Sequence, residues 1–263
     1  MRMHASLWLT CCALTGVARA AEAQGDALPP PPEPELRWSL GTQFKMDDLH
    51  QPGRVALRPM LGLRYGRWRT GAVDGESWHR FGQIVNDNNL TYDLLDSVNW
   101  RTSLSASIVN LQRDSTFDAV QSGRKTLRGR ATIDYLGWSH WSVGLIVAQD
   151  LMDRGAGTSL SPSVTFRQAL SENSTILLSQ SFTWAQSDIW RYTAQADPAV
   201  NLDQASRWGT SMDTSLTLRQ RWKSHWSWFA QLSRNQLLQA GDPVAREGQI
   251  RWAGQVGLIY FQR

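Results

Sequence analysis

The chain has 263 residues and a formal net charge of +4, from 27 basic and 23 acidic side chains. This length allows one domain or at most two. The charges nearly balance, which is not the strongly basic signature of nucleic-acid binding, so we expect no nucleic acid as a partner. A mean hydropathy of −0.39 excludes a helical membrane protein, although the chain contains 14 tryptophans.

Residues 1–20 are typical of a secretory signal peptide. Arg2 and His4 form a polar start, an apolar stretch covers residues 5–17, and residues 18–20 (ARA) place small side chains where a signal peptidase cleaves. The apolar stretch is shorter than the roughly 20 residues that span a bilayer as a helix. A buried N-terminal helix is the alternative, but nothing after residue 20 continues the pattern.

The only cysteines, Cys11 and Cys12, lie inside this segment. The chain after residue 20 therefore has no thiol, no disulfide and no cysteine-based metal site. Its net charge falls to about +2, because Arg2 and Arg19 leave with the signal peptide. A lipoprotein anchor at either cysteine is disfavoured, since neither follows a Leu-small-small run in register.

Residues 21–35 form a segment rich in Pro, Glu and Ala, with consecutive prolines at positions 29–32. Such a composition favours extended polyproline II and cannot build a core, which predicts a periplasmic linker. From residue 36 to residue 263 the sequence instead alternates between apolar and polar side chains. We therefore expect a signal peptide, a linker and a single β-domain over residues 36–263.

The alternation is clear in residues 100–108, where Trp, Thr, Leu, Ala and Ile share one face and Arg and Ser occupy the other. A period of two residues is the pattern of a strand with one apolar face. The runs last about nine to fourteen residues, whereas an average strand has five or six and a tilted strand crosses a bilayer in roughly 9–11. The polar faces, rich in Ser, Thr, Gly and Arg, suit a narrow wet lumen.

These runs predict an all-β fold, an antiparallel transmembrane β-barrel of about twelve strands, with ten as the alternative. Closure of the sheet removes edges that would otherwise aggregate. The expected strands lie near residues 36–44, 54–65, 66–73, 76–84, 98–111, 124–136, 140–150, 158–169, 174–186, 207–221, 225–238 and 249–261.

The connections between these strands alternate between short and long, as in outer-membrane barrels, whose periplasmic turns are short and whose external loops are longer. This alternation places both termini in the periplasm and requires an even number of strands. One connection breaks the pattern, because residues 85–97 form a long loop on the short-turn side.

Aromatic residues cluster at the predicted strand ends, beside short turns. Amphipathic rings prefer the headgroup level of a membrane, so barrels carry aromatic girdles there. Ordinary core aromatics, the alternative, would sit in the middle of strands. The predicted girdle consists of Tyr65, Trp68, Tyr135, Trp138, Trp141, Trp222, Trp226 and Tyr260.

Several segments resemble the MipA/OmpV family of outer-membrane proteins, whose pattern covers roughly residues 36–261. They are residues 61–68 (LGLRYGRW), 140–143 (HWSV), 149–151 (QDL), 183–188 (TWAQSD), 225–228 (HWSW), 233–234 (SR), 237–238 (LL) and 241–243 (GDP). The resemblance implies an outer-membrane barrel that acts as a scaffold for a murein lytic transglycosylase and a murein synthase in peptidoglycan turnover. It implies no residue-level site.

No metalloprotease, nucleophile-elbow or phosphate-loop motif is present in the sequence. We expect no enzyme, no catalytic residue, no cofactor and no metal. Two predicted loops each carry acidic residues together with a histidine. A catalytic group is one interpretation, but ordinary solvated loop residues are the preferred one. The two groups are Asp47, Asp48 and His50, and Asp74, Glu76 and His79. His140 and His225 share the context Ser-His-Trp-Ser, which predicts a hydrogen bond that supports a turn.

The alternation also predicts which charges face the lumen. The expected inward residues are Arg37, Arg58, Arg64, Arg101, Arg128, Arg130, Arg167, Arg219 and Arg251, joined by Asp134, Asp150 and Asp213. One interpretation is a small passive channel that favours anions, because rings of one sign set selectivity. The other is a plugged barrel in which arginine stems fill space and pair with carbonyls and carboxylates.

Overall fold

The structure is a computed structural model that describes residues 35–46, 49, 55–71, 89–110, 125–154, 157–186, 208–239 and 250–262. The predicted signal peptide and almost all of the predicted linker lie outside these residues. Every regular element described is a strand. No helix in the described ranges combines the length and apolarity that a membrane crossing requires.

Twelve strands follow one another along the described chain. They are β1 (Leu36–Met46), β2 (Val55–Tyr65), β3 (Trp68–Thr70), β4 (Leu90–Asp96), β5 (Trp100–Asn110), β6 (Lys125–Tyr135), β7 (Trp141–Asp150), β8 (Thr158–Ala169), β9 (Ser174–Gln186), β10 (Trp208–Arg221), β11 (Trp226–Gln239) and β12 (Ile250–Phe261).

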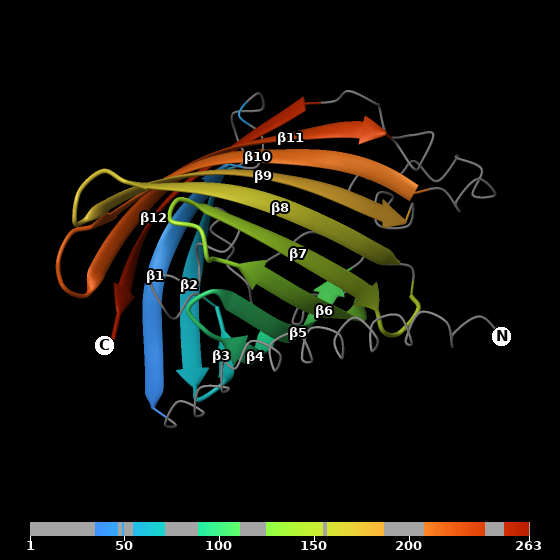
Figure 1. The fold of residues 1–263 in the computed structure, drawn as a ribbon, viewed down its shortest axis with the longest axis horizontal. Coiled ribbons are helices and arrows are strands. Elements are labelled where there is room, and N and C mark those ends of the chain that lie inside the picture. The colour runs from blue at the N-terminus through green and yellow to red at the C-terminus, as the bar shows by residue number, and fades with distance from the viewer. Residues whose placement is uncertain are drawn as a thin grey trace. The chain divides into compact units, whose positions relative to one another are not determined.

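The strands form one closed antiparallel barrel in which each strand pairs with the next. β1 closes the sheet against β12, as the blue and red strands of Figure 1 show, with Ser39 opposite Phe261 and Met46 opposite Gly254. The predicted fold class and strand number are therefore confirmed. The first and last strands both have a terminus at the same end of the barrel, which an even strand number requires.

The predicted position of the fourth strand, at residues 76–84 with a loop at residues 85–97, is wrong. The fourth strand is β4 at Leu90–Asp96, inside the segment predicted as a loop, while residues 76–84 lie outside the described part of the chain. β4 pairs with both β3 and β5, so its backbone groups are bonded on both sides. With this correction the exceptional long loop disappears, and residues 97–99 form a short turn like the others.

The two ends of the barrel differ in the length of their connections. We call the end with the short connections 66–67, 97–99, 136–140, 170–173 and 222–225 the turn end, and the opposite end the loop end. At the β2–β3 turn, Gly66 has a positive φ of 57°. Glycine at the first central position of a two-residue hairpin is what a type II′ turn requires.

The outward faces of the strands are apolar and the inward faces polar. In β2, for example, Leu57 and Leu61 are exposed, whereas Met60 on the other face is buried. In β10, Leu216 is exposed while Ser215 and Thr217 are buried. An exposed apolar exterior around a polar interior is the reverse of a water-soluble barrel and matches a barrel that meets lipid.

Aromatic side chains ring the turn end, as the sequence predicted. Trp226 packs against Tyr260, with 5.3 Å between ring centroids. Tyr135 contacts Trp138 at 5.3 Å. Further ring contacts join Trp38 to Tyr260, Trp68 to Tyr92, Trp100 to Tyr135 and Trp141 to Phe166. The rings therefore form several groups at the turn end, where the headgroups of one leaflet are expected.

Candidate functional site: the arginine-lined lumen

The arginines that the sequence places inside the barrel do lie on its inward face. The register sets Arg37 opposite Arg64, Arg101 opposite Asp134, and Arg219 opposite Phe229. The same face carries basic residues that the sequence analysis did not single out, namely Lys45, Arg69 and Arg221. It also carries Asp93, which was missed because β4 was predicted to be a loop.

At the turn end these charges form a compact ion-pair cluster. The buried Asp93 accepts hydrogen bonds from Arg69 Nε at 3.1 and 3.2 Å to its two oxygens. Arg64 Nη2 lies 3.6 Å from both Asp93 Oδ2 and Asp96 Oδ2, and Arg101 Nε donates to Asp96 Oδ1 at 2.8 Å. Here the plugged interpretation is supported, because arginines pair with carboxylates across β2, β3, β4 and β5.

The loop end is also basic. Arg128 donates from Nη2 to Ser159 Oγ at 2.7 Å, and Arg130 lies two residues further along the same inward face of β6. Asp150, opposite Arg128, accepts hydrogen bonds from the backbone nitrogens of Met152 at 3.0 Å and Arg154 at 2.8 Å. Much of its hydrogen-bonding capacity therefore shapes the β7–β8 connection.

A buried apolar cluster lies between these charged levels on one side of the lumen. It consists of Met60, Phe229, Ile259 and Phe261, which are 0–7% exposed. A glycine makes room for it, since a Cβ at Gly257 would lie 2.5 Å from the Phe229 ring. Inward side chains from β8 to β10 are also buried: Thr165, Ser179, Ser215 and Thr217.

The two repeated histidines lie at the turn end. His140 Nδ1 is 3.2 Å from the carbonyl oxygen of Arg167, and His225 Nδ1 is 3.0 Å from that of Phe261. Both histidines therefore make a structural hydrogen bond, but to the end of a neighbouring strand, so the prediction that each supports its own turn is wrong.

The remaining candidates receive no support as a site. Among the residues that the structure describes, no three histidine, cysteine or acidic side chains gather in a way that could hold a metal ion. The two acidic loop groups with a histidine, around residues 47–50 and 74–79, consist of residues outside the described ranges. That the chain is not an enzyme stays a prediction.

The closed sheet, the apolar exterior, the aromatic groups at the turn end and the charged interior together define a transmembrane β-barrel, the architecture of outer-membrane proteins.

No protein-family model matches the chain, and no curated protein matches its sequence. Membership of the MipA/OmpV family therefore stays a prediction. The chain is similar to the solved structure of OmpT, an outer membrane protein of Vibrio cholerae, with 7% identity, 87% of this chain and 97% of that chain covered, and a TM-score of 0.38. At this similarity no function is transferred from that protein.

Two porin structures match at a comparable level. One porin is 8% identical, with 88% of this chain and 100% of its own covered and a TM-score of 0.42. An anion-selective porin from Comamonas acidovorans is 9% identical, with 87% and 99% covered and a TM-score of 0.38.

Proposed function

We propose that this chain is an outer-membrane channel of low conductance that favours small anions. The observation that carries the proposal is the excess of basic over acidic side chains on the inward face of the described strands. The basic residues there are Arg37, Lys45, Arg58, Arg64, Arg69, Arg101, Arg128, Arg130, Arg167, Arg219, Arg221 and Arg251, against Asp93, Asp96, Asp134, Asp150 and Asp213.

The charged groups are also what a permeating ion would meet. Small hydroxyl side chains of the lumen such as Ser179 and Thr217 are buried, whereas the side chains of Arg64, Arg101 and Asp96 stay 15%, 22% and 40% exposed. Charged side chains that line a pore set the sign of the ions that pass, and a field of one sign raises the local concentration of counter-ions.

The buried level around Phe229 limits the size of the channel. A barrel of about twelve strands lies between barrels filled by side chains and those that hold an open aqueous channel. Because inward side chains are buried at this level, we expect a small unit conductance and exclusion of bulky solutes.

Planar-bilayer recording tests the proposal. With a KCl gradient across the bilayer, the reversal potential of the purified protein should have the sign of chloride selectivity. Exchanging Arg128 and Arg130 for glutamine together should shift the potential toward zero, because it removes two luminal charges at the loop end. Arg234→Gln is the matched control, because Arg234 lies on the outward face of β11 opposite Thr214 and its charge does not line the lumen.

Each outcome bears on the proposal. Protein that is folded, as judged by its heat-modifiable migration on gels, and that passes no current would remove the channel function. Cation selectivity, or an equal shift in Arg234→Gln, would remove the role of the inward arginines.

We further propose that the barrel resides in the outer membrane of a Gram-negative cell with its turn end in the periplasm. Short turns on the periplasmic side are the rule for such barrels.

The scaffold role implied by the family resemblance stays a separate prediction, and no contact among the described residues bears on it. Crosslinking in intact envelopes tests it, since a scaffold should capture a murein lytic transglycosylase or a murein synthase.

A further inference from the structure

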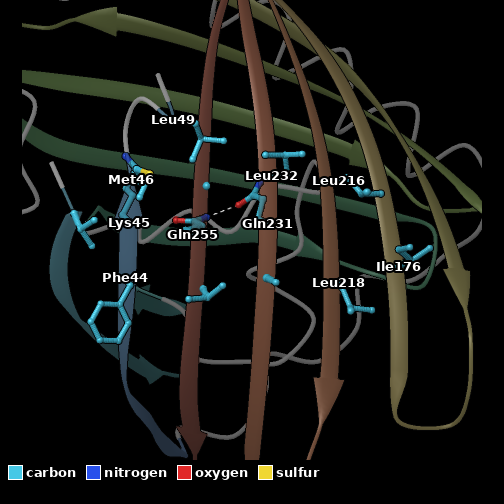
Figure 2. A pocket seen from close by; sticks show the side chains of 14 residues that line it. Phe44, Lys45, Met46, Leu49, Ile176, Leu216, Leu218, Gln231, Leu232 and Gln255 are labelled. Carbon is cyan, nitrogen blue, oxygen red and sulfur yellow. Dashed lines mark hydrogen bonds between the residues drawn. The ribbon is translucent and has the colours of Figure 1, made fainter. Parts of the chain in front are cut away.

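An apolar groove of about 500 Å³ runs across the outside of the barrel wall. It crosses β1, β12, β11, β10 and β9, and its outward-facing lining includes Phe44, Ile176, Leu216, Leu218 and Leu232, labelled in Figure 2. On the inward face beneath it, the amide of Gln255 donates a hydrogen bond to Gln231. The groove therefore faces the lipid and not the lumen.

Small residues create this groove. Ala230 and Gly254 occupy outward positions in β11 and β12 and leave a depression between the larger side chains around them. Gly254 pairs with Leu232, which in turn pairs with Leu216. A Cβ on Gly254 would meet Leu49 at 3.6 Å, so Leu49 bounds the groove beside Gly254.

A polar row begins immediately beyond the groove, toward the loop end. Gln180, Thr214 and Arg234 are paired across β9, β10 and β11. Thr214 and Arg234 lie two residues from the groove residues Leu216 and Leu232 on the same strands. Two residues along a strand amount to about 7 Å, so the row and the groove are adjacent on one face.

The polar row contains hydrogen-bond donors that have no acceptor among the described residues. Thr214 Oγ1 donates to Gln180 Oε1 at 2.9 Å, and Arg234 donates to Gln236 Oε1 at 3.0 Å through Nη2. Gln180 Nε2 is buried and has no hydrogen-bond partner among the described residues. The guanidinium of Arg234 carries further N–H groups. These further N–H groups of Arg234 favour a ligand that accepts hydrogen bonds.

The charge of the row is also unusual for a surface that faces lipid. Among the described residues of β9 to β12, Arg234 is the one basic residue on the outward face, since Arg219, Arg221 and Arg251 point inward. Its partner across β12 is Trp252, an aromatic residue of the kind that marks the headgroup level. Arg234 thus lies beside a side chain of the kind that is enriched near lipid headgroups.

We propose that the groove and the polar row together form a binding site for a phosphate-bearing lipid. An acyl chain lies along Leu216, Leu218 and Leu232, and the phosphate accepts hydrogen bonds from the guanidinium of Arg234. A planar guanidinium matches the geometry of phosphate oxygens, and apolar burial holds the chain. This site lies on the opposite face of the wall from the lumen and does not depend on the channel function.

Native mass spectrometry of the protein released from detergent micelles tests the proposal. Phosphatidylglycerol and a diacylglycerol with the same acyl chains serve as probes, with inorganic phosphate as a competitor. The wild-type protein should retain one phosphatidylglycerol, and Arg234→Gln should weaken its retention about tenfold, the loss expected for a charged hydrogen bond. Gly254→Leu, which fills the groove, should weaken phosphatidylglycerol and diacylglycerol alike.

Arg251→Gln is the matched control, because Arg251 is adjacent to Trp252 but faces the lumen. It should leave lipid retention unchanged, and heat-modifiable migration checks that each variant is folded. Equal retention of phosphatidylglycerol and diacylglycerol by the wild type would overturn the proposal. So would an equal loss in Arg234→Gln and Arg251→Gln, or displacement of the lipid by millimolar inorganic phosphate.

Discussion

At the scale of the residue, Phe229 has the largest of the fully buried side chains on the inward face of the described strands. Its side chain points inward from β11, is fully buried, and lies in one cluster with Met60 and Ile259. Hydrophobic constrictions resist the passage of ions because water leaves them readily. The residue is therefore the natural place to test whether the buried level limits conduction.

We expect Phe229→Ala to increase the unit conductance in planar bilayers, because it removes the largest buried side chain of this level. Phenylalanine-to-alanine exchanges in protein cores cost about 3–5 kcal/mol, so the midpoint of urea unfolding should also fall. Phe182→Ala, which removes a ring from the outward face of β9 where it is 37% exposed, should leave conductance unchanged. A conductance equal to that of the wild type in Phe229→Ala would show that the constriction lies elsewhere.

At the scale of the element, the hairpin of β11 and β12 depends on the close packing of the Phe229 ring against the backbone of Gly257. Gly257 lies opposite Phe229 in β11, and a Cβ there would be 2.5 Å from the ring and 2.8 Å from the carbonyl oxygen of Thr42 in β1. Because Gly257 has no side chain, the Phe229 ring fits between β11, β12 and β1 without displacing the backbone.

We expect Gly257→Ala to destabilise the barrel by about 1–3 kcal/mol, the usual cost of overpacking. The temperature at which the folded form is lost on gels should fall accordingly. Gly254→Ala is the control, since a Cβ at that position meets nothing closer than 3.6 Å and should have little effect. Because the clash with Thr42 is with backbone, combining Gly257→Ala with Phe229→Ala should restore only part of the loss.

Elements also differ in how well the sequence predicts them. β8 and β9 match their predicted ranges, because their alternation is long and their turn at 170–173 is short. β3 and β4 do not, because strands of three and seven residues offer too few positions for a period of two to stand out. β4 also contains a bulge between Asp93 and Leu95, which breaks the alternation within it.

At the scale of the whole molecule, the orientation in the membrane is the main prediction still to be tested. The chain after residue 20 contains no cysteine, so single cysteines can report on each end of the barrel. Glu172→Cys places a thiol in the β8–β9 turn, and Asp153→Cys places one in the β7–β8 connection at the loop end.

We expect a membrane-impermeant maleimide to label Asp153→Cys in intact cells and to label Glu172→Cys only after the outer membrane is permeabilised. The unsubstituted chain serves as the control for labelling of Cys11 or Cys12. The reverse pattern of labelling would place the turn end outside the cell and would contradict the predicted periplasmic termini.

The sequence by itself determined the barrel, most of its strands, the aromatic groups at the turn end and the inward direction of nine arginines, because a period of two residues fixes which face each side chain takes. Only the tertiary structure decided which charges meet, since Asp93 reaches Arg69 and Arg64 through the pairing of β4 with β3 and of β3 with β2. It alone also revealed the buried cluster around Phe229 and the lipid-facing groove beside Arg234. Both depend on which residues of neighbouring strands stand at the same level, and alternation along one strand carries no information about that register.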